Sequence, residues 1–172
     1  MVGYLDSSVA LRHILLGEAA IEHALAADRV VSSELLEIEC RRVIHRCRMQ
    51  GDLDDAGVVT AGDRLDELLR GVSLIGLSPE IKKRAMGAFP VGVKTLDTLH
   101  LASALVLSEK LPDEKVVIFS HDAGLNRCSR ALGFPAPLWE GDGNGEASDR
   151  RGLPDKARQD VQDTARMNRM GR

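Results

Sequence analysis

The sequence predicts an α/β protein with three layers, α/β/α, around a central and mostly parallel sheet. Short apolar runs alternate with longer segments of helical periodicity, which is the pattern of strands separated by helices. Aromatic residues make up only 3% of the chain, so the core must consist of Leu, Val, Ile and Ala, which suits helices layered on a sheet. The length of 172 residues and the hydrophobic content of 44% are those of one compact domain.

Four apolar runs predict the strands of this sheet. Because segments of helical periodicity lie between them, we expect the strands to run parallel, with helices on both faces. The predicted strands are residues 2–5, 29–32, 72–77 and 116–120.

Capping residues predict where several helices begin and end, since Ser is favoured at helix starts and Gly after helix ends. The signals are Ser7 or Ser8 before a helix over residues 9–16, Ser33 before a helix that runs to about residue 49, and Gly133 after a helix over residues 123–132.

The composition changes near the end of the chain. We expect residues 1–140 to form the domain and residues 141–172 to form a polar tail, flexible or bound to a partner. The tail is rich in Gly, Asp, Arg, Gln and Asn and has too few apolar residues to supply a core of its own.

Composition also narrows the setting and the class of protein. No apolar run reaches the roughly 18 residues that span a bilayer, and the first ten residues lack a basic and then apolar leader, so we expect a soluble, cytoplasmic protein. Cys40, Cys47 and Cys128 show no CxxC spacing, and we interpret them as core residues in a reducing compartment. A net charge of −3 argues against a protein that simply coats nucleic acid.

Two acidic residues follow predicted strands directly. Asp6 comes after the first strand and Asp122 after the last, and each precedes a predicted helix. In open α/β sheets, ligands bind at the edge formed by the carboxyl ends of the strands. Either residue alone could equally be an N-cap or a turn residue, because Asp is common in both positions.

A third acid lies on the helix predicted after the second strand. Glu39 stands beside the apolar stripe of that helix, near Val43. An acid at the border of a buried face must be paired or must coordinate a ligand. A surface ion pair with Arg42 or Arg46 is the alternative, and Glu37 remains a second candidate for the same role.

The fourth acid, Asp97, opens a strongly apolar helical segment. A place in the first turn suits the helix dipole, which is the alternative to a functional role. His100 is three residues further on and shares the face of Asp97. It could orient Asp97 or contact a substrate, but a partly buried structural histidine is the more common case.

Four carboxylates brought to one place repel each other, and burial increases that cost, so a divalent cation would be needed to balance them. Oxygen ligands without His or Cys at ligand spacing favour Mg²⁺ or Mn²⁺ over zinc. Such a cation can activate water against a phosphodiester bond. The sequence therefore predicts metal-assisted phosphodiester hydrolysis, with Asp6, Glu39, Asp97 and Asp122 as the metal ligands and catalytic residues.

The segments that carry these acids are YLDSS at 4–8, SSELLEIECRR at 32–42, TLDTLHLASA at 95–104 and FSHDAGL at 119–125. Together and in this order they resemble the PIN-domain nucleases, and most closely the VapC-type toxins of prokaryotic toxin-antitoxin pairs. The resemblance covers residues 1 to about 138. Ser120 stands where Thr is more usual in the family, and His121 has no clear counterpart.

The resemblance implies endonucleolytic cleavage of RNA that depends on Mg²⁺ or Mn²⁺, a homodimer, and a cognate antitoxin that covers the site. Ser8 and Ser120 would then support the site through hydrogen bonds to the carboxylates or to bound water. Candidate contacts to the RNA phosphates are Arg12, Arg41, Arg42, Arg46 and Lys94, with the basic run of residues 82–84 as a further possibility.

Two other classes compete with the nuclease. One is a PIN-like module that binds RNA or protein without cutting it. The other is a phosphoaspartyl protein, in which an Asp after the first strand is the nucleophile. A dehalogenase-type phosphatase would want an acid at the position of Ser8, and a receiver domain would want an acidic pair before the phosphorylated strand, which the sequence lacks.

Overall fold

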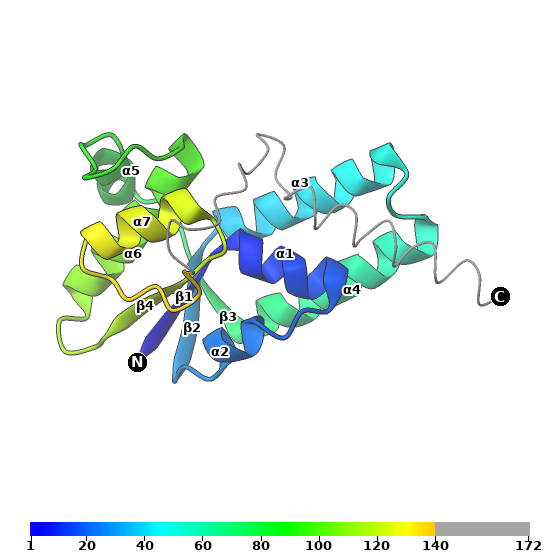
Figure 1. Ribbon diagram of the computed structural model, residues 1–172, viewed down its shortest axis with the longest axis horizontal. Coiled ribbons are helices and arrows are strands. Elements are labelled where there is room, and N and C mark those ends of the chain that lie inside the picture. Colours follow the sequence, from blue (N-terminus) through cyan, green and yellow to red (C-terminus); the bar gives the residue numbers. More distant parts are fainter. Residues whose placement is uncertain (140–172) are drawn as a thin grey trace.

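A four-stranded, entirely parallel sheet forms the centre of the computed structural model, which describes residues 1–139 (Figure 1). The predicted tail at 141–172 lies outside the described residues. The strand order is β3-β2-β1-β4, so the chain adds strands on one side of β1 and then crosses to the other. The strands are β1 (Val2–Leu5), β2 (Arg29–Ser33), β3 (Val72–Ile75) and β4 (Val116–Phe119).

Helices cover both faces of the sheet, which gives the predicted α/β/α layers (Figure 1). One core joins Leu5 and Val30 to α1, α2, α3 and α4, and the other joins Tyr4 and Ile118 to α6 and α7, because successive strand residues point to opposite faces. Helix α5 packs on α6. The helices are α1 (Ser7–Leu16), α2 (Ile21–Leu25), α3 (Leu35–Gln50), α4 (Asp55–Gly71), α5 (Pro79–Ala85), α6 (Thr95–Lys110) and α7 (Ala123–Ala131).

The strand bounds agree with the prediction to within two residues. The largest difference is at β3, which ends at Ile75 rather than at residue 77. The backbone N–H of Leu77 donates to Glu34 Oε1 over 3.0 Å, and the N–H of Ser78 donates to the carbonyl of Gly76 over 2.8 Å. These bonds turn the chain away from the sheet toward α5.

Two predicted caps are wrong in detail. Helix α1 begins at Ser7, and its N-cap is Asp6, whose carboxylate accepts the N–H of Ser8, so neither Ser7 nor Ser8 is the cap. Ser33 is the last residue of β2, yet its hydroxyl still accepts the N–H of Leu35 over 3.2 Å. Gly133 follows α7 with φ = +90°, a conformation that glycine adopts without strain.

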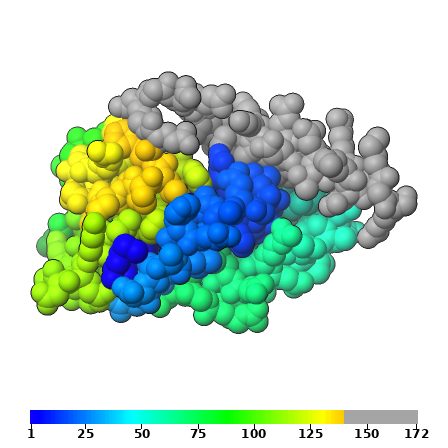
Figure 2. Space-filling view, turned by 60° about the horizontal axis from the view of Figure 1, so that its bottom comes forward, coloured from blue at the N-terminus to red at the C-terminus, as the bar shows by residue number. Residues whose placement is uncertain are grey.

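Burial agrees with the interpretation of the cysteines, because Cys40, Cys47 and Cys128 all lie in the core. Among residues 1–139, no helix has the length and apolar character needed to cross a membrane. The N-terminus reaches the surface, where Figure 2 shows it in the darkest blue, and the Met1 amino group pairs with Asp28.

Candidate metal centre

Asp6 is buried at the carboxyl end of β1 and is held there by several hydrogen bonds. Its backbone N–H donates to the Phe119 carbonyl over 3.0 Å, which continues the pairing of β1 with β4. Its side chain is only 5% exposed and accepts from the N–H and hydroxyl of Ser8 and from the hydroxyl of Ser120. All three of these bonds end on Oδ2, so Oδ1 is the oxygen that could take a further ligand.

The two serines connect the turn after β1 with the turn after β4. Ser120 donates to Asp6 over 2.9 Å while its oxygen accepts the N–H of Asp122 over 2.9 Å. Ser8 donates to Asp6 and accepts the N–H of His121 over 2.9 Å. Asp6 and Asp122 are therefore fixed in one bonded unit, although 116 positions separate them in the chain (122 − 6).

Asp122 is the N-cap of α7 and also faces a lysine. Its Oδ1 accepts the N–H of Leu125 over 2.9 Å, and its Oδ2 lies 2.9 Å from Lys94 Nζ. Burial favours the protonated acid, but the hydrogen bonds from Lys94 and from the Leu125 backbone outweigh it and lower the pKa of Asp122. Asp122 is therefore a carboxylate at neutral pH.

Asp97 lies in the first turn of α6 and accepts the backbone N–H of Lys94 over 3.3 Å. Burial, together with the negative charges of Asp122 and Asp6, raises the pKa of Asp97 from 3.8 to about 6. Lys94 opposes this rise without cancelling it. Burial and the neighbouring carboxylates thus both disfavour the charged form of Asp97, and a cation bound nearby would favour it.

Glu39 reaches the same region from α3 and is bonded to a buried histidine. His100 Nε2 lies 2.9 Å from Glu39 Oε2, and the other ring nitrogen lies 3.2 Å from the Tyr4 hydroxyl and 3.4 Å from that of Ser33. Burial alone would lower the pKa of His100, but the hydrogen bond to Glu39 and the charge of Asp6 raise it. The partner of His100 is Glu39 and not Asp97, which the sequence had not indicated.

The charges of the four acids act on Asp97 or on His100, but the four carboxylates do not surround a common point closely enough to bind an ion. Asp6 and Asp122 act on Asp97, and Asp6, Glu39 and Asp97 act on His100. Within the described part of the chain, no three His, Cys, Asp or Glu side chains stand close enough together to hold an ion as they are placed. The four acids offer carboxylate oxygens, which are the ligands that Mg²⁺ and Mn²⁺ prefer, and such a cation would favour the charged form of Asp97.

Glu37, the second candidate for the role of Glu39, is engaged elsewhere. It pairs with Arg41 over 2.8 Å, and Arg41 also binds Asp66 over 2.8 Å on the exposed side of α3 and α4. The structure therefore gives Glu39, and not Glu37, the position beside the buried face.

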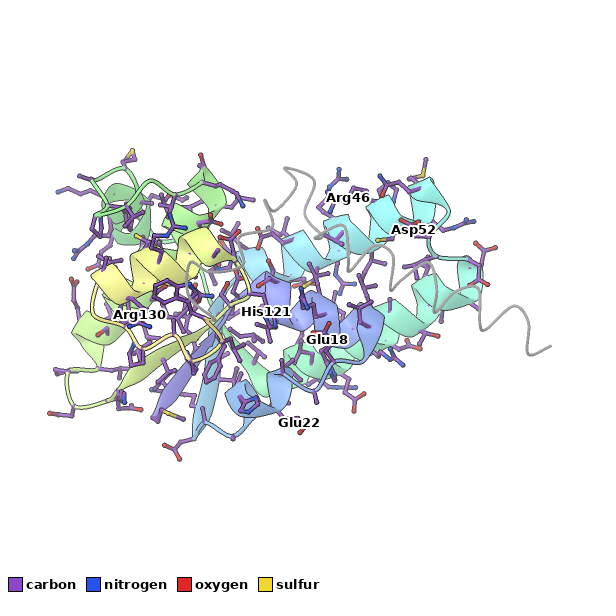
Figure 3. The ribbon with its side chains drawn as sticks, viewed as in Figure 1. Glu18, Glu22, Arg46, Asp52, His121 and Arg130 are labelled. Atoms are coloured by element: carbon purple, nitrogen blue, oxygen red, sulfur yellow. The ribbon has the colours of Figure 1, made fainter. Side chains whose placement is uncertain are left out.

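The candidate phosphate contacts lie in different settings. Arg12 pairs with Glu18 over 3.0 Å, and Lys94 is bonded to Asp122. Arg46 lies in the C-terminal half of α3, toward Asp52 and away from His121 at the start of α7 (Figure 3). Of these candidates, Lys94 is the one in direct contact with a predicted metal ligand.

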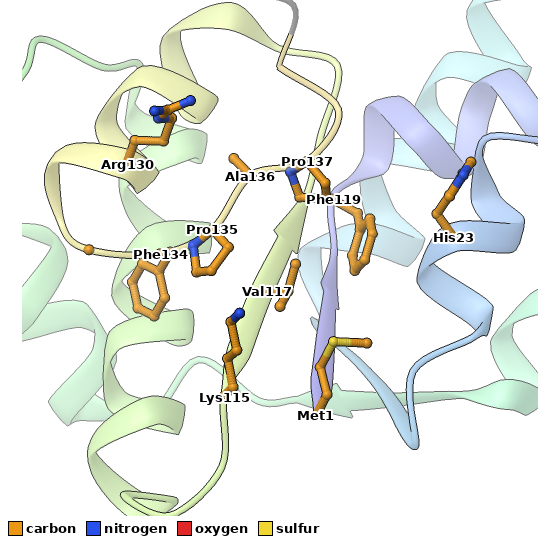
Figure 4. Close-up of a pocket in the computed structure, with 11 residues that line it drawn as sticks. Met1, His23, Lys115, Val117, Phe119, Arg130, Phe134, Pro135, Ala136 and Pro137 are labelled. Atoms are coloured by element: carbon orange, nitrogen blue, oxygen red, sulfur yellow. The ribbon is translucent and has the colours of Figure 1, made fainter.

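A separate cavity of about 710 Å³ lies beside β4 and α2 (Figure 4). None of the four acids lines it. Its walls are mostly apolar and include Phe119, Phe134 and Pro135, with Lys115 and His23 at the edge. We do not associate this cavity with the acidic centre.

Acids that follow the strands at the carboxyl edge of a parallel α/β/α sheet lie where ligands bind in such folds. The model of the PIN domain family matches residues 3–130, which is most of the chain, and the protein belongs to that family. PIN domains are generally nucleases that use divalent metal ions. A search of curated proteins gives no match.

The raised pKa of Asp97 predicts a specific pH dependence of stability. Well below pH 3.8 the acid is protonated in both the folded and the unfolded state, and well above pH 6 it is charged in both, with the cost of that charge present only in the folded state. Between these limits the folded state binds more protons, so the free energy of unfolding falls as pH rises. Without metal, the free energy of unfolding of Asp97→Asn should exceed that of the wild type at pH 7 by about 1 kcal/mol, with solvent screening allowed for, and the difference should vanish well below pH 3.8.

Thermal unfolding of both proteins in EDTA across this pH range measures the difference. Asp63→Asn, on the exposed side of α4, is the matched control and should follow the wild type. If the stability of the wild type and that of Asp97→Asn changed with pH in parallel, the raised pKa of Asp97 would be contradicted.

Proposed function

We propose that the protein is an endoribonuclease that depends on Mg²⁺ or Mn²⁺ and hydrolyses RNA phosphodiester bonds. The observation that carries the proposal is the proximity of the Asp6, Asp97 and Asp122 carboxylates: burial first, and then the charges of Asp122 and Asp6, raise the pKa of Asp97 to about 6. A divalent cation bound there would favour the charged form of Asp97 and relieve the repulsion among these carboxylates, and acids with perturbed pKa values occur often at functional sites. Membership of the PIN-domain family supports the same activity.

In this proposal, Asp6, Glu39, Asp97 and Asp122 hold the cation directly or through water. When bound, the cation supplies Lewis-acid polarisation of the phosphodiester and activation of the attacking water. Ser8 and Ser120 fix the orientation of Asp6 by donating to Oδ2, so that Oδ1 is presented to the ligand. His100 holds Glu39 in the same way through a 2.9 Å bond.

We further propose that the protein is the toxin of a toxin-antitoxin pair, acting as a homodimer in the cytoplasm. The support is the resemblance of the four acidic segments to VapC-type toxins. Controlled expression should then arrest growth, and co-expression of a cognate antitoxin should restore it. Light scattering of the purified protein measures its oligomeric state.

A module that binds RNA or protein without cleavage is the second candidate. It is favoured by the fact that two of the four acids already lie against basic side chains, Asp122 against Lys94 and Glu39 against His100. Such a module would bind RNA equally well with and without metal.

The deciding experiment is cleavage of a labelled RNA by the purified protein with Mg²⁺, with Mn²⁺ and with EDTA. The nuclease proposal expects products only with metal, and it expects a DNA of the same sequence to be cut less. Unchanged RNA in all three conditions, together with retained RNA binding, would favour the second candidate.

A further inference from the structure

Lys94 contacts two of the four acids through two different groups. As the N-cap residue of α6, it donates its backbone N–H to Asp97 Oδ2 over 3.3 Å. Its side chain reaches the second acid, and Nζ lies 2.9 Å from Asp122 Oδ2. The ammonium thus occupies an oxygen of a carboxylate that the proposed function assigns to the metal.

We propose that Lys94 is a displaceable internal counter-ion of the acidic centre. Its ammonium balances Asp122 in the metal-free protein and must leave that carboxylate before a divalent cation can bind there at full affinity. This inference rests on the proposed function, because it concerns the same four acids. It adds a residue that competes with the cation for one of its ligands.

Exposure shows which partner of the pair can move. The Lys94 side chain is 61% exposed, whereas that of Asp122 is 19% exposed and its other oxygen is fixed as the cap of α7. The lysine stem is flexible and its ammonium is readily hydrated, so it can swing into solvent at little cost. Asp122 stays in place and keeps its carboxylate at the edge of the sheet.

The Lys94 ammonium and a divalent cation would compete for the same oxygen of Asp122. Lys94 already lowers the pKa of Asp97, and the hydrogen bond to Asp122 raises the pKa of Lys94 itself. A divalent cation at Asp122 would repel the ammonium, which then lies at the rim of the centre, still attached to the N-terminus of α6. There it is available to a phosphate of the substrate.

The test is the affinity for Mn²⁺ without RNA, measured by titration calorimetry on the full chain. Lys94→Met should bind Mn²⁺ about fivefold more tightly than the wild type, which corresponds to the worth of one partly exposed ion pair. Lys94→Arg keeps the charge and the pair and should stay close to the wild type. Lys110→Met, which removes a surface lysine paired with Glu80 over 3.1 Å, is the matched control.

A double-mutant cycle separates direct competition from long-range charge. In an Asp122→Asn background, Lys94→Met should change the Mn²⁺ affinity by less than about twofold, because the contested carboxylate is gone. An equal gain in both backgrounds, or no gain in the wild-type background, would overturn the inference. Absence of Mn²⁺ binding by the wild type would instead overturn the proposed function. Circular dichroism of each variant checks that it is folded.

Discussion

Asp97→Asn should lower kcat for RNA cleavage by about 10³-fold, since the several kcal/mol that a metal ion contributes to the transition state would be largely lost. The substitution keeps the shape of the side chain and removes the charge that repels Asp122 and Asp6. The fold should therefore be retained, and metal-free stability at neutral pH should increase. Single-turnover cleavage and thermal unfolding on the same preparation give both readings.

Asp63→Asn again serves as the control, because it removes one exposed carboxylate from α4 without touching the acidic centre. It should cleave like the wild type. If Asp97→Asn were as active as this control, Asp97 would have no part in the reaction. If it were inactive because it was unfolded, the thermal measurement would reveal that directly.

His100→Ala should destabilise the protein by about 2–4 kcal/mol, because it creates a cavity and leaves buried polar groups without partners. His100 is 1% exposed and joins Tyr4 and Ser33 on one side to Glu39 on the other. Loss of the imidazole frees the Glu39 carboxylate to change its rotamer. The affinity for Mn²⁺ should therefore fall as well, in the fraction that remains folded.

Denaturant unfolding measures the first effect and titration calorimetry the second. His45→Ala removes an exposed histidine from α3 and should change stability by less than about 0.5 kcal/mol. His100→Gln retains a hydrogen-bonding group and should recover part of the loss. A His100→Ala protein as stable as the His45→Ala control would show that the buried network contributes nothing.

The strands β1 and β4 could be predicted from the sequence because they are buried on both faces. Parallel strands covered by two layers of helices read as unbroken apolar runs, and 2–5 and 116–120 are unmistakable as such. Their order along the chain also placed Asp6 and Asp122 at one edge. Helix starts were harder, because Asp6, Ser7 and Ser8 are all good caps and only the backbone conformation decides among them.

Hydrogen bonds from Ser8 and Ser120 to a carboxylate were expected, but the basic partners of Glu39 and Asp122 could not be predicted. Glu39 meets His100 across 61 positions and Lys94 meets Asp122 across 28, and such pairs depend on how helices from different parts of the chain pack. Local spacing suggested Arg42 or Arg46 for Glu39 and Asp97 for His100. Both predictions took partners from the same helix, whereas in the structure Glu39 on α3 pairs with His100 on α6.

The strand order has a consequence for how this centre could be altered. The chain reverses its winding direction beside β1, so the helix that leaves β1 packs on one face while the helix that leaves β4 packs on the opposite face. The two segments are joined once more by the bond from the His121 N–H to the Ser8 hydroxyl, and α1 and α7 then lie on opposite faces. Just beyond this fork, Val9 and Leu125 are buried in the two cores, whereas Ser7 and Ala123 are not buried, so substrate preference could be redesigned at Ser7 and Ala123 with least penalty to the scaffold.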